Sequence, residues 1–104
     1  MQRSKGLMTL GLAARAGKVS SGEMMVEKAI RGGKAYLLLI AEDASEATKK
    51  RFTDHASYYQ VPSLFVSDRE TLGRAIGKDY RATVVVGDEK LAALIKEQLE
   101  AEKA

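Results

Sequence analysis

Apolar residues follow two patterns along this chain, short continuous runs and longer segments with helical spacing, and the two alternate. The runs at 35–41 and 82–86 are almost entirely apolar. Such runs are typical of strands that are covered on both faces of a sheet. Shorter extended segments are predicted at 18–20 and, after Pro62, at 63–66.

Helical spacing predicts five further segments, each with one apolar face. The first covers 2–16, with Leu7, Leu10 and Ala14 on its face, and ends at Gly17. In the other four the predicted faces comprise Met25, Val26, Ala29 and Ile30; then Ala44, Ala47, Phe52, Ala56 and Tyr59; then Leu72, Ala75 and Ile76; and finally Leu91, Leu94, Ile95 and Leu99. We expect residues 100–104 to fray.

Residues with capping chemistry mark where these helices begin and end. Capping spacing joins Ser20 to Glu23, Asp43 to Glu46 and Ser67 to Glu70, and Asp88 precedes the last helix. Glycines at 32–33 and 77 close the second and fourth helices. The alternation of helices and strands predicts a single domain over 1–104, an α/β fold in which a mixed four-stranded sheet is the middle layer of a three-layer α/β/α sandwich.

Composition narrows the class of protein. The chain has 104 residues and no cysteine, which excludes disulfides, zinc–cysteine sites and thiol nucleophiles and fits a reducing cytoplasm. No signal peptide is visible, and the longest apolar run, 36–41, is too short to span a membrane. We expect a cytoplasmic monomer that does not associate with membranes.

Charge is concentrated at one end of the chain. Residues 1–34 hold seven Lys or Arg and two Glu, a local net charge of +5 in a chain whose total is +3. A lopsidedly basic segment around a helix start favours nucleic-acid binding, because free N–H groups and cations both attract phosphate. Two basic groups stand out: Arg15, Lys18, Lys28, Arg31 and Lys34, expected to cluster on one face, and Arg74, Lys78 and Arg81. The run 49–51 is interpreted as solvated helix surface that nearby acids neutralise.

Signatures of catalysis are weak. The segment 11–18 resembles a phosphate-binding loop, but its glycines are one residue too far apart and Val19 replaces the required Ser or Thr. His55 has no cysteine or serine nucleophile to activate. Glu42 and Asp43 follow a buried strand, and Asp68 and Asp88 follow two others, although both also suit helix caps. We predict a protein without catalytic activity, cofactor or metal.

The order of the motifs resembles the ribosomal L7Ae/L30e superfamily, and in particular its small bacterial members. The resemblance rests on residues 22–35, on the strand that ends in Ala41-Glu42-Asp43-Ala44, on Val61-Pro62, and on the segment Leu72-Gly73-Arg74-Ala75-Ile76-Gly77. It covers nearly the whole chain. It implies an α/β/α sandwich that binds kinked RNA, ribosomal or otherwise structured, with ribosomal proteins as further candidate partners.

The resemblance also implies which residues contact RNA. The turn at Gly22 and the following helix start would meet tandem G·A pairs, with Lys28 beside them, and the loop 79–82 would pack on an extruded nucleotide. Together with the basic positions, the predicted RNA-binding set is Arg15, Lys18, Gly22, Glu23, Met24, Lys28, Arg31, Tyr80, Arg81 and Ala82.

Two positions depart from the pattern of kink-turn binders. Many of these carry Asn-Glu where this chain has Met24-Met25, and Tyr80-Arg81 replaces a small aliphatic–glycine pair. Thioethers do not read base edges as an amide and a carboxylate do. We expect Met25 on the core face and Met24 in solvent. Two alternatives stay open: a protein-interaction module on the same scaffold, and a small α/β enzyme using Glu42, Asp43 and Asp88.

Overall fold

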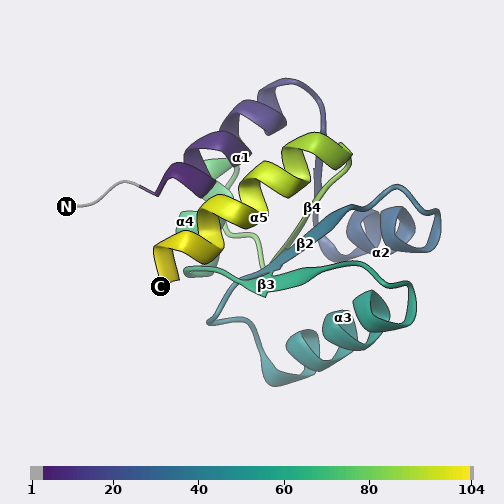
Figure 1. The fold of residues 1–104 in the computed structure, drawn as a ribbon. Coiled ribbons are helices and arrows are strands. Elements are labelled where there is room, and N and C mark those ends of the chain that lie inside the picture. Colours follow the sequence, from purple (N-terminus) through teal and green to yellow (C-terminus); the bar gives the residue numbers. More distant parts are fainter. Residues whose placement is uncertain (1–3, 104) are drawn as a thin grey trace.

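A computed structural model describes residues 4–103, in which five helices alternate with four strands (Figure 1). The elements in chain order are α1 (Lys5–Arg15), β1 (Val19–Ser21), α2 (Glu23–Arg31), β2 (Leu37–Ile40), α3 (Glu46–Tyr58), β3 (Ser63–Phe65), α4 (Arg69–Ala75), β4 (Thr83–Val86) and α5 (Glu89–Lys103). Each strand lies within a residue or two of its predicted place. Residues 2 and 3 of the first predicted helix lie outside the described residues.

The strands form one mixed sheet in the order β1-β4-β2-β3. Strand β4 pairs antiparallel with both β1 and β2, and β2 pairs parallel with β3. The central strands β2 and β4 are buried along their whole length. Their apolar side chains alternate between the two faces of the sheet, which is why both strands are continuous apolar runs.

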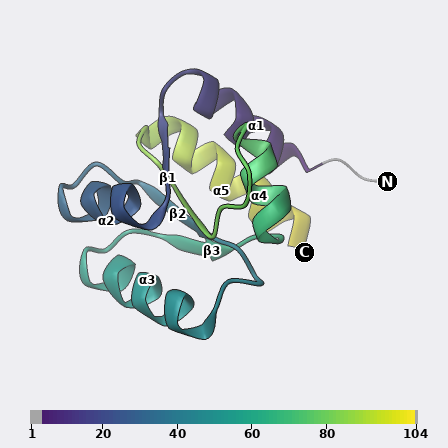
Figure 2. The same cartoon turned by 180° about the vertical axis from the view of Figure 1, so that it is seen from behind.

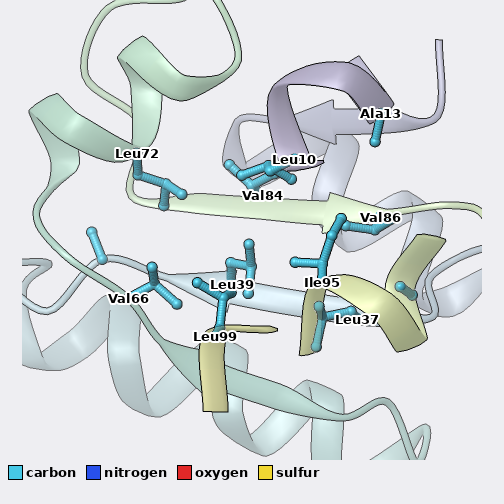
Figure 3. Packing of buried hydrophobic residues seen from close by; sticks show 12 residues of the cluster. Leu10, Ala13, Leu37, Leu39, Val66, Leu72, Val84, Val86, Ile95 and Leu99 are labelled. Atoms are coloured by element: carbon cyan, nitrogen blue, oxygen red, sulfur yellow. The ribbon is translucent and has the colours of Figure 1, made fainter. Parts of the chain in front are cut away.

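Helices cover each face of this sheet. Leu37 and Leu39 of β2 point toward α1, α4 and α5, where they pack against Leu10, Leu72 and Ile95 (Figure 3). Leu38 and Ile40 point the other way, into a second cluster with residues of α2 and α3. The structure therefore confirms the predicted three-layer sandwich with a mixed four-stranded sheet.

Three helices begin at residues other than those that the capping spacing predicts. Ser20 is wrong as the cap of α2, because it lies inside β1, paired with Val85, and Gly22 precedes the helix instead. The cap of α3 is Ser45, whose hydroxyl accepts a hydrogen bond from the Thr48 N–H. The cap of α4 is Asp68, whose position after a strand also suits a cap, and not its neighbour Ser67.

Four side chains predicted to face the core are exposed: Met25 at 55%, Leu94 at 43%, Tyr59 at 40%, and Ala47. Other residues of each helix form its buried face, which for α3 consists of Phe52 and Ala56. Val26 and Ile30, one helical turn apart, carry the buried face of α2. Ala92, Ile95 and Leu99 do the same for α5.

The chain end does not fray as predicted over 100–103. Helix α5 continues to Lys103, with Leu99 buried against α1. Glu102 accepts hydrogen bonds from the Ser4 hydroxyl at 2.6 Å and the Gly6 N–H at 3.0 Å. A carboxylate at the start of α1 satisfies a free N–H and meets the positive end of the helix dipole, so it holds the two helices together. Ala104 lies outside the described residues.

The helices between residues 4 and 103 are all too short or too polar to cross a membrane.

Candidate nucleic-acid interface

The turn at Gly22 joins β1 to α2 and sets the start of the basic helix. Its φ of +88° lies in the left-handed region, which residues with a side chain rarely adopt, so glycine is required there. No side chain caps α2, and its first internal hydrogen bond runs from the Val26 N–H to the Gly22 carbonyl. The earlier N–H groups of the first turn are therefore available to an acceptor outside the protein.

The loop 79–82 lies beside this turn, although sixty residues separate the two in sequence. The Gly22 N–H points to the Thr83 carbonyl at 3.4 Å, and the Arg81 Nε donates to the Ser21 hydroxyl at 3.1 Å. A second guanidinium nitrogen of Arg81 donates to the Tyr80 carbonyl. Pairing of β1 with β4 thus brings together the two segments that the family resemblance assigns to one RNA site.

Helix α4 holds the other side of the loop. The Arg81 N–H donates to the Arg69 carbonyl at 3.1 Å. At Gly73 the loop backbone comes so close that a Cβ would overlap the Asp79 carbonyl oxygen and lie 3.2 Å from the Arg81 nitrogen. Gly73 is therefore required by the close approach of backbone to helix, and it fixes where the loop stands.

Exposed apolar side chains lie on both segments. Met24 and Met25, in the first turn of α2, are 80% and 55% exposed, and Tyr80 in the loop is 63% exposed. The Arg69 guanidinium lies 6.0 Å from the Tyr80 ring centroid. Ala82, like Arg81, is anchored, since its carbonyl accepts a hydrogen bond from the Ala41 N–H. The predicted exposure of Met24 is confirmed.

The two acids of α2 are paired with a cation from another helix. The Arg51 guanidinium on α3 donates to Glu23 at 3.0 Å and to Glu27 at 2.7 Å. These contacts keep the pKa of Glu27 below its usual value, because the hydrogen bond from Arg51 outweighs the opposing effect of burial. Lys49 and Lys50 pair with Glu46 and Asp54. The prediction that nearby acids neutralise the run 49–51 is therefore confirmed, and the acids that neutralise Arg51 lie on another helix.

Three lysines line one hollow between β1 and α2, which we call the lysine hollow. It measures about 450 Å³, is bounded by Val19 and Met25 among others, and has no acidic residue in its wall. Its cations are Lys18, Lys28 and Lys34. Within residues 4–103 none of these lysines, nor the exposed Arg31 in the last turn of α2, makes an ion pair.

Arg15 lies elsewhere. It lines a groove between α1 and α4 together with Arg74, so the structure does not bring it into the lysine hollow. In the second basic group, Arg74 pairs with Glu70 at 3.2 Å and Arg81 binds Ser21.

Three of the acids considered for catalysis, Asp43, Asp68 and Asp88, have structural partners. Asp43 accepts a hydrogen bond from the Arg69 N–H at 2.8 Å and lies 3.5 Å from its guanidinium. Asp68 and Asp88 cap α4 and α5, as their positions after strands allow. His55 lies 3.7 Å from Glu27, between α2 and α3. In the described part of the chain, no group of three or more potential metal ligands comes together.

Comparison with known proteins agrees with this geometry. Residues 4–95 match the model of the ribosomal protein L7Ae/L30e/S12e/Gadd45 family. The chain belongs to this family. The assignment confirms the sequence resemblance and the prediction that the protein is not an enzyme.

Relatives within the L7Ae/L30e/S12e/Gadd45 family match most of the chain. The RNA-binding protein YlxQ of Bacillus subtilis (strain 168) is 52% identical over 83 residues, 80% of this chain and 83% of the relative. That of Enterococcus faecium is 39% identical over 98 residues, 94% of each chain. A solved protein of unknown function from Bacillus halodurans C has a TM-score of 0.91 at 38% identity, covering 94% of this chain and 99% of its own.

Sequence reasoning missed the residues that hold the interface in place. Arg51, Arg69 and Gly73 act through contacts between elements far apart in the chain, and residue spacing gives no signal for such contacts. Of the three, only Gly73 lies in a segment on which the family resemblance rests.

We predict that Gly73→Ala displaces the loop 79–82, because the new Cβ overlaps the Asp79 carbonyl. The free energy of unfolding should fall by about 1–3 kcal/mol, and amide resonances of 79–82 should shift. Urea denaturation and amide NMR measure both effects. Gly32→Ala is the matched control, since its Cβ would meet nothing closer than the Lys28 carbonyl at 3.2 Å. Equal stability of the two variants with an unmoved loop would contradict the assigned role of Gly73.

Proposed function

We propose that this protein binds structured RNA through the Gly22 turn, the loop 79–82 and the lysine hollow. The observation that carries the proposal is the cluster of unpaired cations in the lysine hollow: Lys28 in α2, Lys18 just before β1 and Lys34 just after α2. The start of the same helix offers free N–H groups. Phosphate is the ligand that both features favour. Relatives over most of the chain bear the name of RNA-binding proteins, which supports the same function.

Each segment has its own role in this proposal. Gly22, Glu23 and Met24 approach the groove of the RNA, where the missing Cβ of Gly22 allows close contact. Lys18, Lys28, Lys34 and Arg31 neutralise phosphates of the adjoining strand. Tyr80, Arg81 and Ala82 pack on an unpaired nucleotide, with the ring of Tyr80 as the stacking surface. Arg15, in its separate groove, contributes only if the RNA extends over α1.

We propose a kink-turn or a similarly bent RNA as the target, ribosomal or otherwise, bound by a monomer in the bacterial cytoplasm. The interface has two parts with different chemistry: the Gly22 turn with its aromatic loop, and the cations of the lysine hollow. A bent RNA can contact one part with unpaired nucleotides and the other with its phosphates. The exposed thioethers of Met24 and Met25 contact bases by packing rather than by hydrogen bonds. Recognition then depends on the shape of the RNA more than on base-edge donors and acceptors.

Phosphate contacts make the binding dependent on salt. With about four phosphates neutralised, the slope of log affinity against log salt should lie near −3 to −4. Lys28→Ala should weaken binding by about 1–3 kcal/mol and make the slope shallower by about one. Fluorescence anisotropy over a salt series measures both. Lys50→Ala removes the same charge from α3, where Asp54 already neutralises it, and should leave the affinity unchanged. An affinity independent of salt would exclude the proposed interface.

Polar base readers can be installed at the two methionines. Met24→Asn combined with Met25→Glu should increase the preference for a kink-turn over an RNA lacking the tandem G·A pairs, by at least about tenfold, since hydrogen bonds to charged groups contribute about 1.5–3 kcal/mol. Both side chains are exposed, so the fold should tolerate the change. Met24→Ala with Met25→Ala is the control that removes the thioethers alone. A folded Asn–Glu variant without added discrimination would show that the target is another RNA.

A Tyr80 variant distinguishes two roles of the ring, stacking on an RNA base and covering α4. Because its ring is largely exposed, Tyr80→Ala should lower RNA affinity by about 1–3 kcal/mol while leaving the thermal midpoint almost unchanged. Tyr58→Ala removes an even more exposed tyrosine at the end of α3 and should alter neither the affinity nor the thermal midpoint. Loss of stability with unaltered affinity would assign Tyr80 to the cover of α4.

A further inference from the structure

A second hollow lies on the other side of the sheet, between α1 and α4, and we call it the α1–α4 groove. It measures about 780 Å³ and is the larger of the two hollows described here. Its apolar wall comes mainly from Leu7, Met8 and Leu12 of α1 and from Ala75 and Ile76 at the end of α4. Figure 2 shows the two helices side by side, with α2 and α3 on the opposite face of the sheet.

Two of the apolar side chains of this groove, Met8 and Leu12, lie outside the core. Helix α1 packs on the sheet through Leu10 and Ala13, which are fully buried, whereas Met8 and Leu12 are 55% and 57% exposed. They lie one helical turn apart and form a ridge along α1. Gly11, between them in sequence, lets α4 approach, since a Cβ there would lie 2.8 Å from the Ala75 carbonyl. Large exposed apolar residues gathered in one groove mark an interaction surface.

The charged residues of the groove all have the same sign. Arg15 and Arg74 line it, and no acidic residue does. Among the described residues Arg15 has no ion-pair partner, and Arg74 has only the solvent-exposed pair with Glu70 on its own helix, which contributes little. The groove thus combines an apolar ridge with two cations available to an external carboxylate.

We propose that the α1–α4 groove binds an amphipathic helix of a partner protein, with apolar residues facing Met8 and Leu12 and acidic residues facing Arg15 and Arg74. Two helical walls with a ridge of one-turn spacing match the geometry of helix-in-groove recognition. The occupant carries acidic side chains because the only charges that it meets are positive.

Other occupants fit less well. A second copy related by a twofold axis would place Arg15 and Arg74 near their own counterparts, without an acid in the groove to compensate. RNA would gain from the arginines but would meet an aliphatic wall with no aromatic residue to stack on. Because the groove and the lysine hollow lie on opposite faces of the sheet, a helix in the groove leaves the lysine hollow free.

The methionine methyl groups offer a direct test, since Met8 lies in the groove and Met24 and Met25 lie at the RNA interface. The probe is a synthetic fifteen-residue helical peptide with leucines along one face and glutamates on its flanks, added to methyl-labelled full-length protein. We expect the Met8 resonance to shift while those of Met24 and Met25 stay in place. A twin peptide with lysine for every glutamate should bind at least ten times more weakly.

Variants identify the groove as the binding surface. Leu12→Glu and Arg74→Glu should each weaken the acidic peptide at least tenfold, and Leu12→Glu should leave RNA affinity unchanged. Leu94→Glu and Lys90→Glu place the same charges on exposed positions of α5 and should have no effect on peptide affinity. Circular dichroism confirms that each variant is folded. Equal binding of the two peptides, or no shift at Met8, would overturn the proposal.

A photo-crosslinking residue at position 12 extends the test to cells. We expect crosslinks to a protein segment with acidic amphipathic character, absent when the residue is placed at position 94. Crosslinks to RNA, to a second copy of the chain, or to no partner would overturn the proposal. The RNA interface would be unaffected by that result, since its own tests use Lys28 and Tyr80.

Discussion

The pairing of β1 with β4 is the constraint on which the candidate interface depends. It consists of three residue pairs, from Val19 with Val86 to Ser21 with Val84, and it places the end of β1 beside the start of β4. Gly22 and the loop 79–82 are neighbours only because of this register. Slipping the register by one residue would turn the side chains of β1 to the other face and move Gly22 away from the loop. The antiparallel register of β1 and β4 therefore determines the relative position of the two segments of the candidate interface.

The net charge of α2 depends on a contact with α3, the other helix of its layer. Without Arg51, Glu23 and Glu27 would place two unpaired negative charges on the helix that carries Lys28 and Arg31. The Arg51 guanidinium, donating to both carboxylates, leaves the cations as the uncompensated charges of α2. The positive charge that α2 presents therefore depends on α3 as well, and it is greater than the sequence of α2 alone indicates.

The sequence predicts the buried elements well and the contacts between them poorly. Strands β2 and β4 are continuous apolar runs because both faces are covered, so their pattern alone identifies them. The cap of α2 could not be found this way, because Ser20 has capping chemistry but its backbone pairs with Val85. The Gly22 turn, Lys28 and the loop at Tyr80 could be named from the family pattern. Their mutual positions, and the separation of Arg15, follow from the sheet and from tertiary packing.

The alternation of side chains in β2 and β4 also separates the two surfaces of the molecule. Leu37 and Leu39 support the layer that bears the α1–α4 groove, and Leu38 and Ile40 support the layer that bears α2. Each layer packs on its own set of side chains, so a substitution on the outer side of one layer leaves the packing of the other intact. Additivity of distant sites then holds between the groove and the lysine hollow. A domain of this size can therefore carry two binding surfaces without requiring either to change when the other is occupied.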